Sequence, residues 1–155
     1  MPRRPAILVA LTLTLVAAGC GGASKEEFEA DVVAARNDAD AGLKQVVQAT
    51  SVEDLLARMR IAAVEVRRAS TDVREAGAPD DLEDERDRLA DDLLALSDEI
   101  VSTVETFEAL PDQAQATRAL NFENWNAVQA SLAALRREGV NVLPLGRHAP
   151  ELQRQ

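Results

Sequence analysis

The segment between residues 51 and 76 has the most regular hydrophobic spacing in this chain. Its apolar residues recur at alternating intervals of three and four positions: Val52, Leu55, Met59, Ala62, Val66, Ala69, Val73 and Ala76. An α-helix turns once in 3.6 residues, so this spacing places all of them on one helical face. Gly77 follows directly and is a typical helix terminator. The pattern predicts an amphipathic helix that must bury one long face against other helices.

Capping patterns mark where the first two helices begin. Ser24 and Glu27 form a capping box, and Thr50 with Glu53 repeats the pattern ahead of the segment over residues 51–76. Between them lies a stripe of apolar or small residues at helical spacing: Phe28, Val32, Ala35, Ala39, Gly42, Val46 and Ala49. We therefore expect a first helix over residues 24–49 and a second over residues 51–76.

Proline residues delimit the other two predicted helices. Pro79 opens a segment over residues 80–110, and Pro111 ends it. The stripe of this third segment is Leu82, Leu89, Leu93, Leu96, Ile100, Thr103, Phe107 and Leu110. A fourth segment, over residues 112–138, carries Leu120, Trp125, Val128, Leu132 and Leu135 and ends before Gly139.

The four predicted helices have similar lengths, each near ~40 Å at a rise of 1.5 Å per residue. Short connections make consecutive helices antiparallel, so we predict an all-α fold, an up-down-up-down antiparallel four-helix bundle over residues 24–138. Two alternatives stay open: a three-helix domain with a frayed or rearranged fourth segment, and a helical hairpin that completes its core in an oligomer. An intermolecular coiled coil competes with these, but four separate capped segments with tight turns favour folding within one chain.

The first 20 residues follow the order of a bacterial export signal. Arg3 and Arg4 supply a positive start, residues 6–18 are apolar except for two threonines, and small residues precede Cys20. The apolar run of 13 residues is shorter than the roughly 20 residues that span a bilayer. We therefore expect residues 1–19 to be a cleaved signal peptide rather than a membrane span.

The stretch Val16-Ala17-Ala18-Gly19-Cys20 contains the only cysteine of the chain. It resembles the lipobox of bacterial lipoproteins. This resemblance implies cleavage between Gly19 and Cys20, a diacylglyceryl group on the Cys20 thiol, and an acyl chain such as palmitate on the new amino terminus. Leader and composition together are similar to those of small uncharacterised helical lipoproteins of Gram-positive bacteria, a resemblance that brings no activity. An ordinary secretory leader is the alternative.

Lipidation at Cys20 would place the protein on the outer, extracytoplasmic face of the cell membrane, since two or more acyl chains anchor a protein durably. Residues 20–23 would then form a tether of at most ~10 Å. The tail over residues 139–155 would start beside the membrane. Folding back over the bundle, disorder and contact with lipid headgroups are its three alternatives.

Charge and residue types narrow the function. The 27 acidic residues exceed the 17 basic ones, which disfavours nucleic acid as a partner. His148 is the only histidine, and no catalytic residue, metal site or cofactor is predicted beyond the lipid on Cys20. An acidic run from Asp80 to Asp87 lies where the dipole at a helix start favours negative charge. The alternative to this role at the helix start is that the run from Asp80 to Asp87 binds divalent ions.

Two functions from different classes fit these features. The first is a non-catalytic protein-interaction or scaffold module with a partner in the cell envelope. The second is a carrier or sensor that binds an apolar small ligand between the helices, near Leu89, Leu93, Phe107 and Trp125. An enclosed apolar cavity near Trp125 would favour the carrier, and a solid core with an exposed apolar strip would favour the interaction module.

Overall fold

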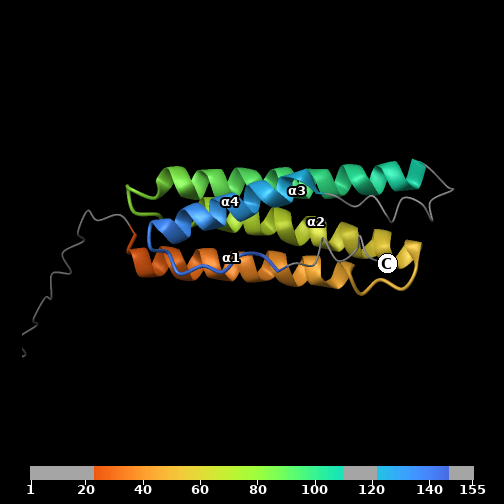
Figure 1. The fold of residues 1–155 in the computed structure, drawn as a ribbon, viewed down its shortest axis with the longest axis horizontal. Helices are drawn as coiled ribbons and strands as arrows, with labels where there is room; N and C mark the ends of the chain where they lie inside the picture. The colour runs from red at the N-terminus through yellow and green to blue at the C-terminus, as the bar shows by residue number, and fades with distance from the viewer. Residues whose placement is uncertain (1–22, 110–121, 147–155) are drawn as a thin grey trace, which may run out of the picture.

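The computed structural model describes residues 23–109 and 122–146, which form four α-helices and no β-strand (Figure 1). The helices are α1 (Lys25–Val46), α2 (Val52–Glu75), α3 (Glu83–Ala109) and α4 (Glu123–Arg137). Each helix runs opposite to the one before it, and α1 packs on α2, α2 on α3, and α3 on α4 (Figure 1). The prediction of an up-down-up-down helical bundle is confirmed.

The predicted capping box begins α1. The Ser24 hydroxyl accepts a hydrogen bond from the Glu27 N–H at 3.2 Å, and the Glu27 carboxylate accepts one from the Ser24 N–H at 3.3 Å. The helix ends at Val46, three residues before the predicted end. The start of α2 differs by one residue from the prediction, because Ser51 rather than Thr50 is the N-cap and accepts from the Asp54 N–H at 3.1 Å.

The third helix begins three residues later than predicted. Residues 80–82 form a turn in which the Leu82 N–H donates to the Pro79 carbonyl at 2.9 Å, and α3 starts at Glu83. Leu82 is nonetheless buried. This turn therefore places the apolar side chain of Leu82 in the core and leaves the acidic residues around it at the surface.

The prediction of a continuous fourth helix from residue 112 is wrong. Phe122 has an extended backbone, with φ −81° and ψ 108°, and α4 begins only at Glu123. No side chain of α4 caps this start. Instead the Glu99 carboxylate, on α3, accepts hydrogen bonds from the N–H groups of Glu123 at 2.6 Å and Asn124 at 2.9 Å. The predicted residues 112–121 lie outside the described part of the chain.

The core contains most of the predicted stripe residues of the four helices, but Val52 is 41% exposed, and Leu110 and Leu120 lie outside the described residues. The largest fully buried side chains include Phe28 of α1, Met59 of α2, Ile100 of α3 and Leu135 of α4. Polar groups in the interface between α2 and α3 are satisfied within it: the Ser70 hydroxyl donates to the Ala90 carbonyl at 2.6 Å. Small residues set the distance between α1 and α2, because Gly42 lies against Ala62 and Glu65.

We predict that Gly42→Leu destabilises the bundle. A Cβ atom at Gly42 would stand 3.0 Å from the Cβ of Glu65 and 3.4 Å from the Cα of Ala62, so a larger side chain must push α1 away from α2. The free energy of unfolding, from urea titration followed by circular dichroism, should fall by about 1–3 kcal/mol. The control is Ala41→Leu at the neighbouring exposed position. Equal stabilities of the two variants would contradict the close approach.

A second prediction concerns acid. Hydrogen bonds from the Thr50 N–H at 3.0 Å and from Arg58 at 2.8 Å lower the pKa of Asp54 below its ordinary value of 3.8. A carboxyl group whose pKa is lower in the folded state stabilises the fold above its ordinary pKa, and this stabilisation is lost as the pH falls through the folded-state pKa. Asp54→Asn should therefore lower the melting temperature at pH 7, and the difference from wild type should begin to shrink near pH 3.8 and disappear only below the lower folded-state pKa.

The control for this measurement is Asp72→Asn. Asp72 forms a looser pair with Arg68, at 3.9 Å, near the other end of the same helix. This variant removes the same charge without removing a helix-start contact. A melting-temperature difference for Asp54→Asn that persists unchanged in acid would show that ionisation of Asp54 does not stabilise α2.

Candidate functional site

The segment after α4 turns back and lies along the bundle. Residues 140–146, here called the strap, run between α1 and α4 (Figure 1). Val140, Val142 and Leu145 are buried, whereas Leu143 is 67% exposed. Of the alternatives for the tail over residues 139–155, folding back over the bundle therefore holds for its part up to residue 146. The rest lies outside the described residues.

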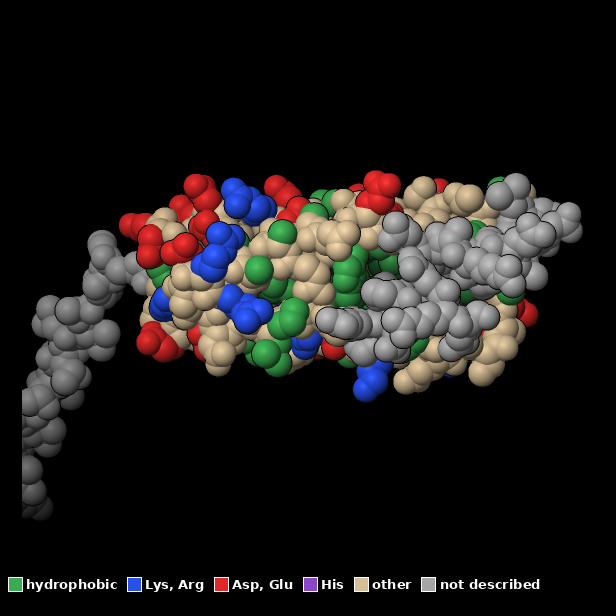
Figure 2. All heavy atoms as spheres, viewed as in Figure 1, with side chains coloured by type: hydrophobic (Ala, Val, Ile, Leu, Met, Phe, Trp, Pro, Cys, Tyr) green, Lys and Arg blue, Asp and Glu red, His purple; other side chains and the backbone are tan. Residues whose placement is uncertain are grey.

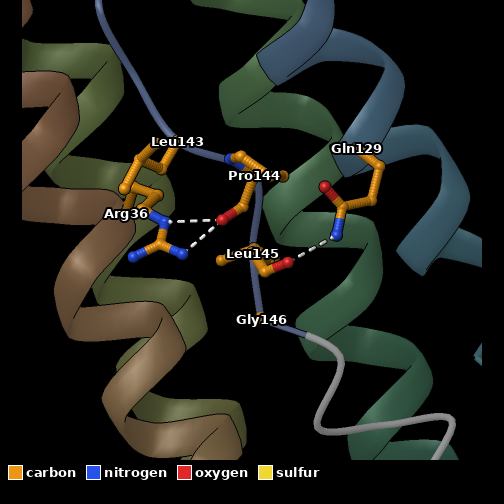
Figure 3. Close-up of a pocket in the computed structure, with 6 residues that line it drawn as sticks. All are labelled: Arg36, Gln129, Leu143, Pro144, Leu145 and Gly146. Atoms are coloured by element: carbon orange, nitrogen blue, oxygen red, sulfur yellow. Dashed lines mark hydrogen bonds between the residues drawn. The ribbon is translucent and has the colours of Figure 1, made fainter.

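Side chains of α1 and α4 hold the strap by its main chain. From α1, Glu29 accepts from the Asn141 N–H at 2.7 Å, and Arg36 donates to the Pro144 carbonyl at 3.1 Å. Asp40 accepts from the Gly146 N–H at 2.6 Å, and Arg36 and Asp40 also pair with each other. From the other side, Gln129 of α4 donates to the Leu145 carbonyl at 2.9 Å. Figure 3 shows Arg36 and Gln129 reaching the strap from opposite helices.

A pocket of about 510 Å³ lies at this place and opens to solvent. It is lined by Arg36, Gln129, Leu143, Pro144, Leu145 and Gly146 (Figure 3). Arg36 and Gln129 already bond the strap, so the polar atoms that would orient a small ligand are engaged. The pocket is therefore a gap beside the strap rather than an enclosed apolar chamber.

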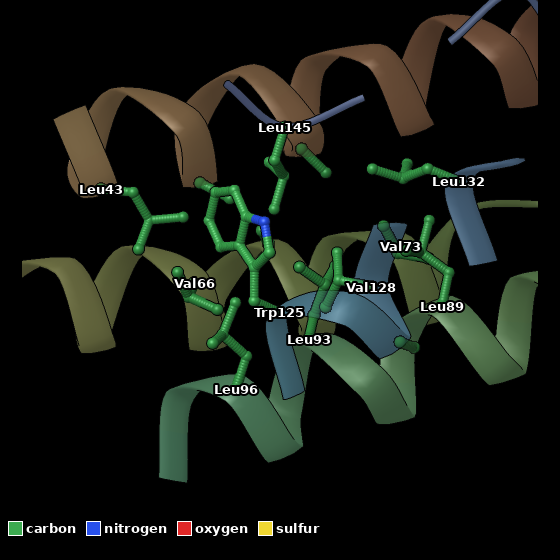
Figure 4. Packing of buried hydrophobic residues seen from close by; sticks show 14 of the residues in the cluster. Leu43, Val66, Val73, Leu89, Leu93, Leu96, Trp125, Val128, Leu132 and Leu145 are labelled. Atoms are coloured by element: carbon green, nitrogen blue, oxygen red, sulfur yellow. The ribbon is translucent and has the colours of Figure 1, made fainter. Parts of the chain in front are cut away.

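The predicted cluster of large apolar residues is only partly assembled. Leu89, Leu93 and Trp125 are buried in the core, and Figure 4 shows the Trp125 ring with Leu93 and Leu96 on one side and Leu145 of the strap on the other. Phe107 is half-buried and packs against the core. It follows Leu93 by 14 residues on the same helix, about 21 Å along the axis. Phe107 therefore does not share the surroundings of Trp125.

A second feature is a group of exposed apolar residues on the two central helices. They are Ile61 and Val64 on α2, with Leu94 and Val101 on α3, here called the α2–α3 surface. Three ion pairs also join α2 and α3: Arg60 with Glu108, Arg67 with Asp98, and Arg74 with Asp91. Val64 is 64% and Ile61 50% exposed. These side chains are at the surface while the core beneath them is closed.

The start of α1 is held in place by contacts with two other parts of the chain. Ala23 lies against Gly77, where an added Cβ atom would be 2.7 Å from the Cβ of Ala23. The Lys25 ammonium donates to the Glu138 carbonyl just after α4. The start of α1, the α2–α3 turn and the end of α4 therefore meet at one end (Figure 1). On the described part of the face drawn in Figure 2, acidic and basic side chains gather at this end. The predicted lipidation and cleavage sites, Cys20 and Gly19, lie outside the described residues.

Within residues 23–109 and 122–146, no three Cys, His, Asp or Glu side chains converge so as to hold a metal ion, and this includes the run from Asp80 to Asp87. Over the same ranges no helix has both the length and the hydropathy of a bilayer span. Comparison of the chain with protein-family models, with curated proteins and with solved structures finds no match.

We predict that Leu145 is a main hydrophobic contact of the strap. Leu145→Ala removes a buried side chain beside Trp125, the only tryptophan, and should lower the free energy of unfolding by about 2 kcal/mol. Tryptophan emission should shift to longer wavelength as water reaches the ring. Leu143→Ala, two residues away and exposed, is the control and should change neither quantity. A Leu145→Ala protein with wild-type emission would show that the strap does not cover Trp125.

Proposed function

We propose that this chain is a lipoprotein anchored by Cys20 to the outer face of the cell membrane, and that its bundle is a non-catalytic interaction module. Anchoring is supported by the leader over residues 1–19 and the small residues before Cys20. The position of Ala23 agrees with it, since residues 20–23 allow the bundle to stand at most about 10 Å from the lipid. The fixed contact of Ala23 with Gly77 then directs one defined end toward the membrane.

The single observation that supports interaction is the α2–α3 surface. Its side chains Ile61, Val64, Leu94 and Val101 are exposed, whereas Met59, Val66, Leu93 and Ile100 on the same two helices are buried. Exposed apolar side chains on two helices that pack against each other are compatible with a surface that binds another protein. Because these residues lie along the sides of α2 and α3, they remain accessible when the end near Ala23 faces the bilayer. The arginine–carboxylate pairs between α2 and α3 add charged groups to the same pair of helices.

The carrier hypothesis has less support. It requires an enclosed apolar cavity near Trp125, but the Trp125 ring is packed between α3 and the strap (Figure 4). The pocket beside the strap opens to solvent, and its polar side chains bond the chain itself. We therefore propose an envelope protein, and not a small apolar ligand, as the partner.

The anchor is tested by mass spectrometry of protein extracted from the native host. We expect a chain that starts at Cys20 and carries diacylglyceryl and acyl groups. Cys20→Ser should leave the protein unlipidated and released from membranes. A chain with Met1 intact, or with a free thiol at Cys20, would contradict anchoring.

The interaction is tested by photo-crosslinking in intact cells. A photoreactive residue at position 64 or 101 should crosslink to one discrete protein, and the same residue at position 41 on α1 should not. Val64→Asp keeps the core intact because Val64 is exposed, and it should reduce the crosslink from position 101 at least about tenfold, as expected when a charge is buried unpaired in an interface. Equal crosslinking from positions 41, 64 and 101 would contradict a docking role for the α2–α3 surface.

A further inference from the structure

The strap fills the space between α1 and α4, which in a regular four-helix bundle is closed by direct packing of the first helix on the fourth. Among the described residues, the pairs that pack closely are α1 with α2, α2 with α3, and α3 with α4, whereas α1 and α4 are not such a pair. The strap lies between them and buries Val140, Val142 and Leu145 there. The space between α1 and α4 is therefore a groove that an extended segment fills.

The groove is built to hold an extended main chain. Its donors and acceptors, Arg36, Gln129, Glu29 and Asp40, all belong to α1 and α4, and each one bonds a backbone N–H or carbonyl of the strap. Among the contacts between strap and groove, only those made by the three buried apolar side chains depend on the amino-acid sequence of the strap. Because none of the four polar residues belongs to the strap, the groove keeps its bonding groups when the strap leaves.

A short turn joins the strap to α4. Gly139, the sole residue of the described part with positive φ, has φ +82° and reverses the chain after α4. A Cβ atom there would stand 3.0 Å from the Lys25 ammonium nitrogen. Side chains other than glycine adopt this backbone conformation rarely. The strap thus stays in its own groove only while this turn keeps a conformation that glycine alone adopts readily.

We propose that the groove between α1 and α4 is a binding site for the strap of a second copy of this chain, so that two molecules exchange their straps. The strap is the one occupant whose fit the structure displays, and its bonds to Glu29, Arg36, Asp40 and Gln129 can be made equally by the groove of another molecule. Exchange of an identical element forms dimers at low energetic cost, and the hinge decides between closed monomer and exchanged dimer. The inference does not depend on lipidation or on the α2–α3 surface.

The experiment uses residues 20–155 with Cys20→Ser, which retain every described residue and carry no native thiol. One preparation carries Asp40→Cys in the groove and another carries Gly146→Cys in the strap, the two positions that the hydrogen bond of 2.6 Å joins. After mixing, a short bismaleimide reagent crosslinks the two positions between molecules only when a strap lies in the groove of the other copy. The collision control pairs Gly146→Cys with Arg68→Cys, an exposed position on α2.

We expect covalent dimers from the first mixture and few from the collision control. Adding Gly139→Val to both chains should raise the dimer yield about tenfold, because the closed turn is strained for a side chain. The same variant should convert monomer to dimer in light-scattering measurements. A chain that carries both cysteines and is crosslinked beforehand within itself should form no dimer.

A dimer yield equal to that of the collision control, with or without Gly139→Val, would overturn the proposal. A free peptide of residues 138–146 provides a further test of the proposal. Inhibition of crosslinking by this peptide supports a groove that accepts a strap from outside. Peptide binding without any dimer of the full chain would overturn exchange between copies and point to an extended segment of another protein. Circular dichroism of each variant shows whether the bundle is folded before it is crosslinked.

Discussion

Burial of the apolar face of α2 is the interaction on which the rest of the bundle depends. This helix packs against both α1 and α3, and its core residues Met59, Val66 and Val73 are fully buried. Alanine at positions 62 and 69, together with Gly42 on α1, allows close contact between helices. Close contact gives each methyl group many neighbours, and dispersion attraction is strong only at short range. α1 and α3 are positioned against this helix, and α4 packs on α3.

Features that depend on local sequence were predictable, and features that depend on distant residues were not. The spacing of Val52 to Ala76 and the pairing of Ser24 with Glu27 are local, and both give the expected helix and cap. The start of α4 was placed wrongly because its N–H groups are capped by Glu99, which belongs to another helix. Nothing in the sequence near residue 122 signals that contact.

The strap groove illustrates the same limit. Glu29 and Arg36 have the spacing of solvent-facing residues on an amphipathic helix, and sequence patterns assign such residues to the surface. Their partners at Asn141 and Pro144 lie more than 100 positions away. Folding back was one of three alternatives for the tail over residues 139–155, but the sequence did not reveal which two helices Val140 and Val142 lie between. Leu89, Leu93 and Trp125 are buried as their helical spacing predicts, but the spacing did not show that Phe107 lies away from Trp125.

The clamped start of α1 has a mechanical consequence. Ala23 rests on Gly77, and Lys25 is bonded to the carbonyl of Glu138, so the first turn is held from two sides. A force that pulls the amino terminus along the helix axis is then distributed over three chain segments. The force therefore does not detach α1 one turn at a time. Tension of this kind loads the long apolar interface in shear, where many contacts must slip together. Under the proposed anchoring at Cys20, the contacts of this first turn would resist a force that pulls the domain from its tether.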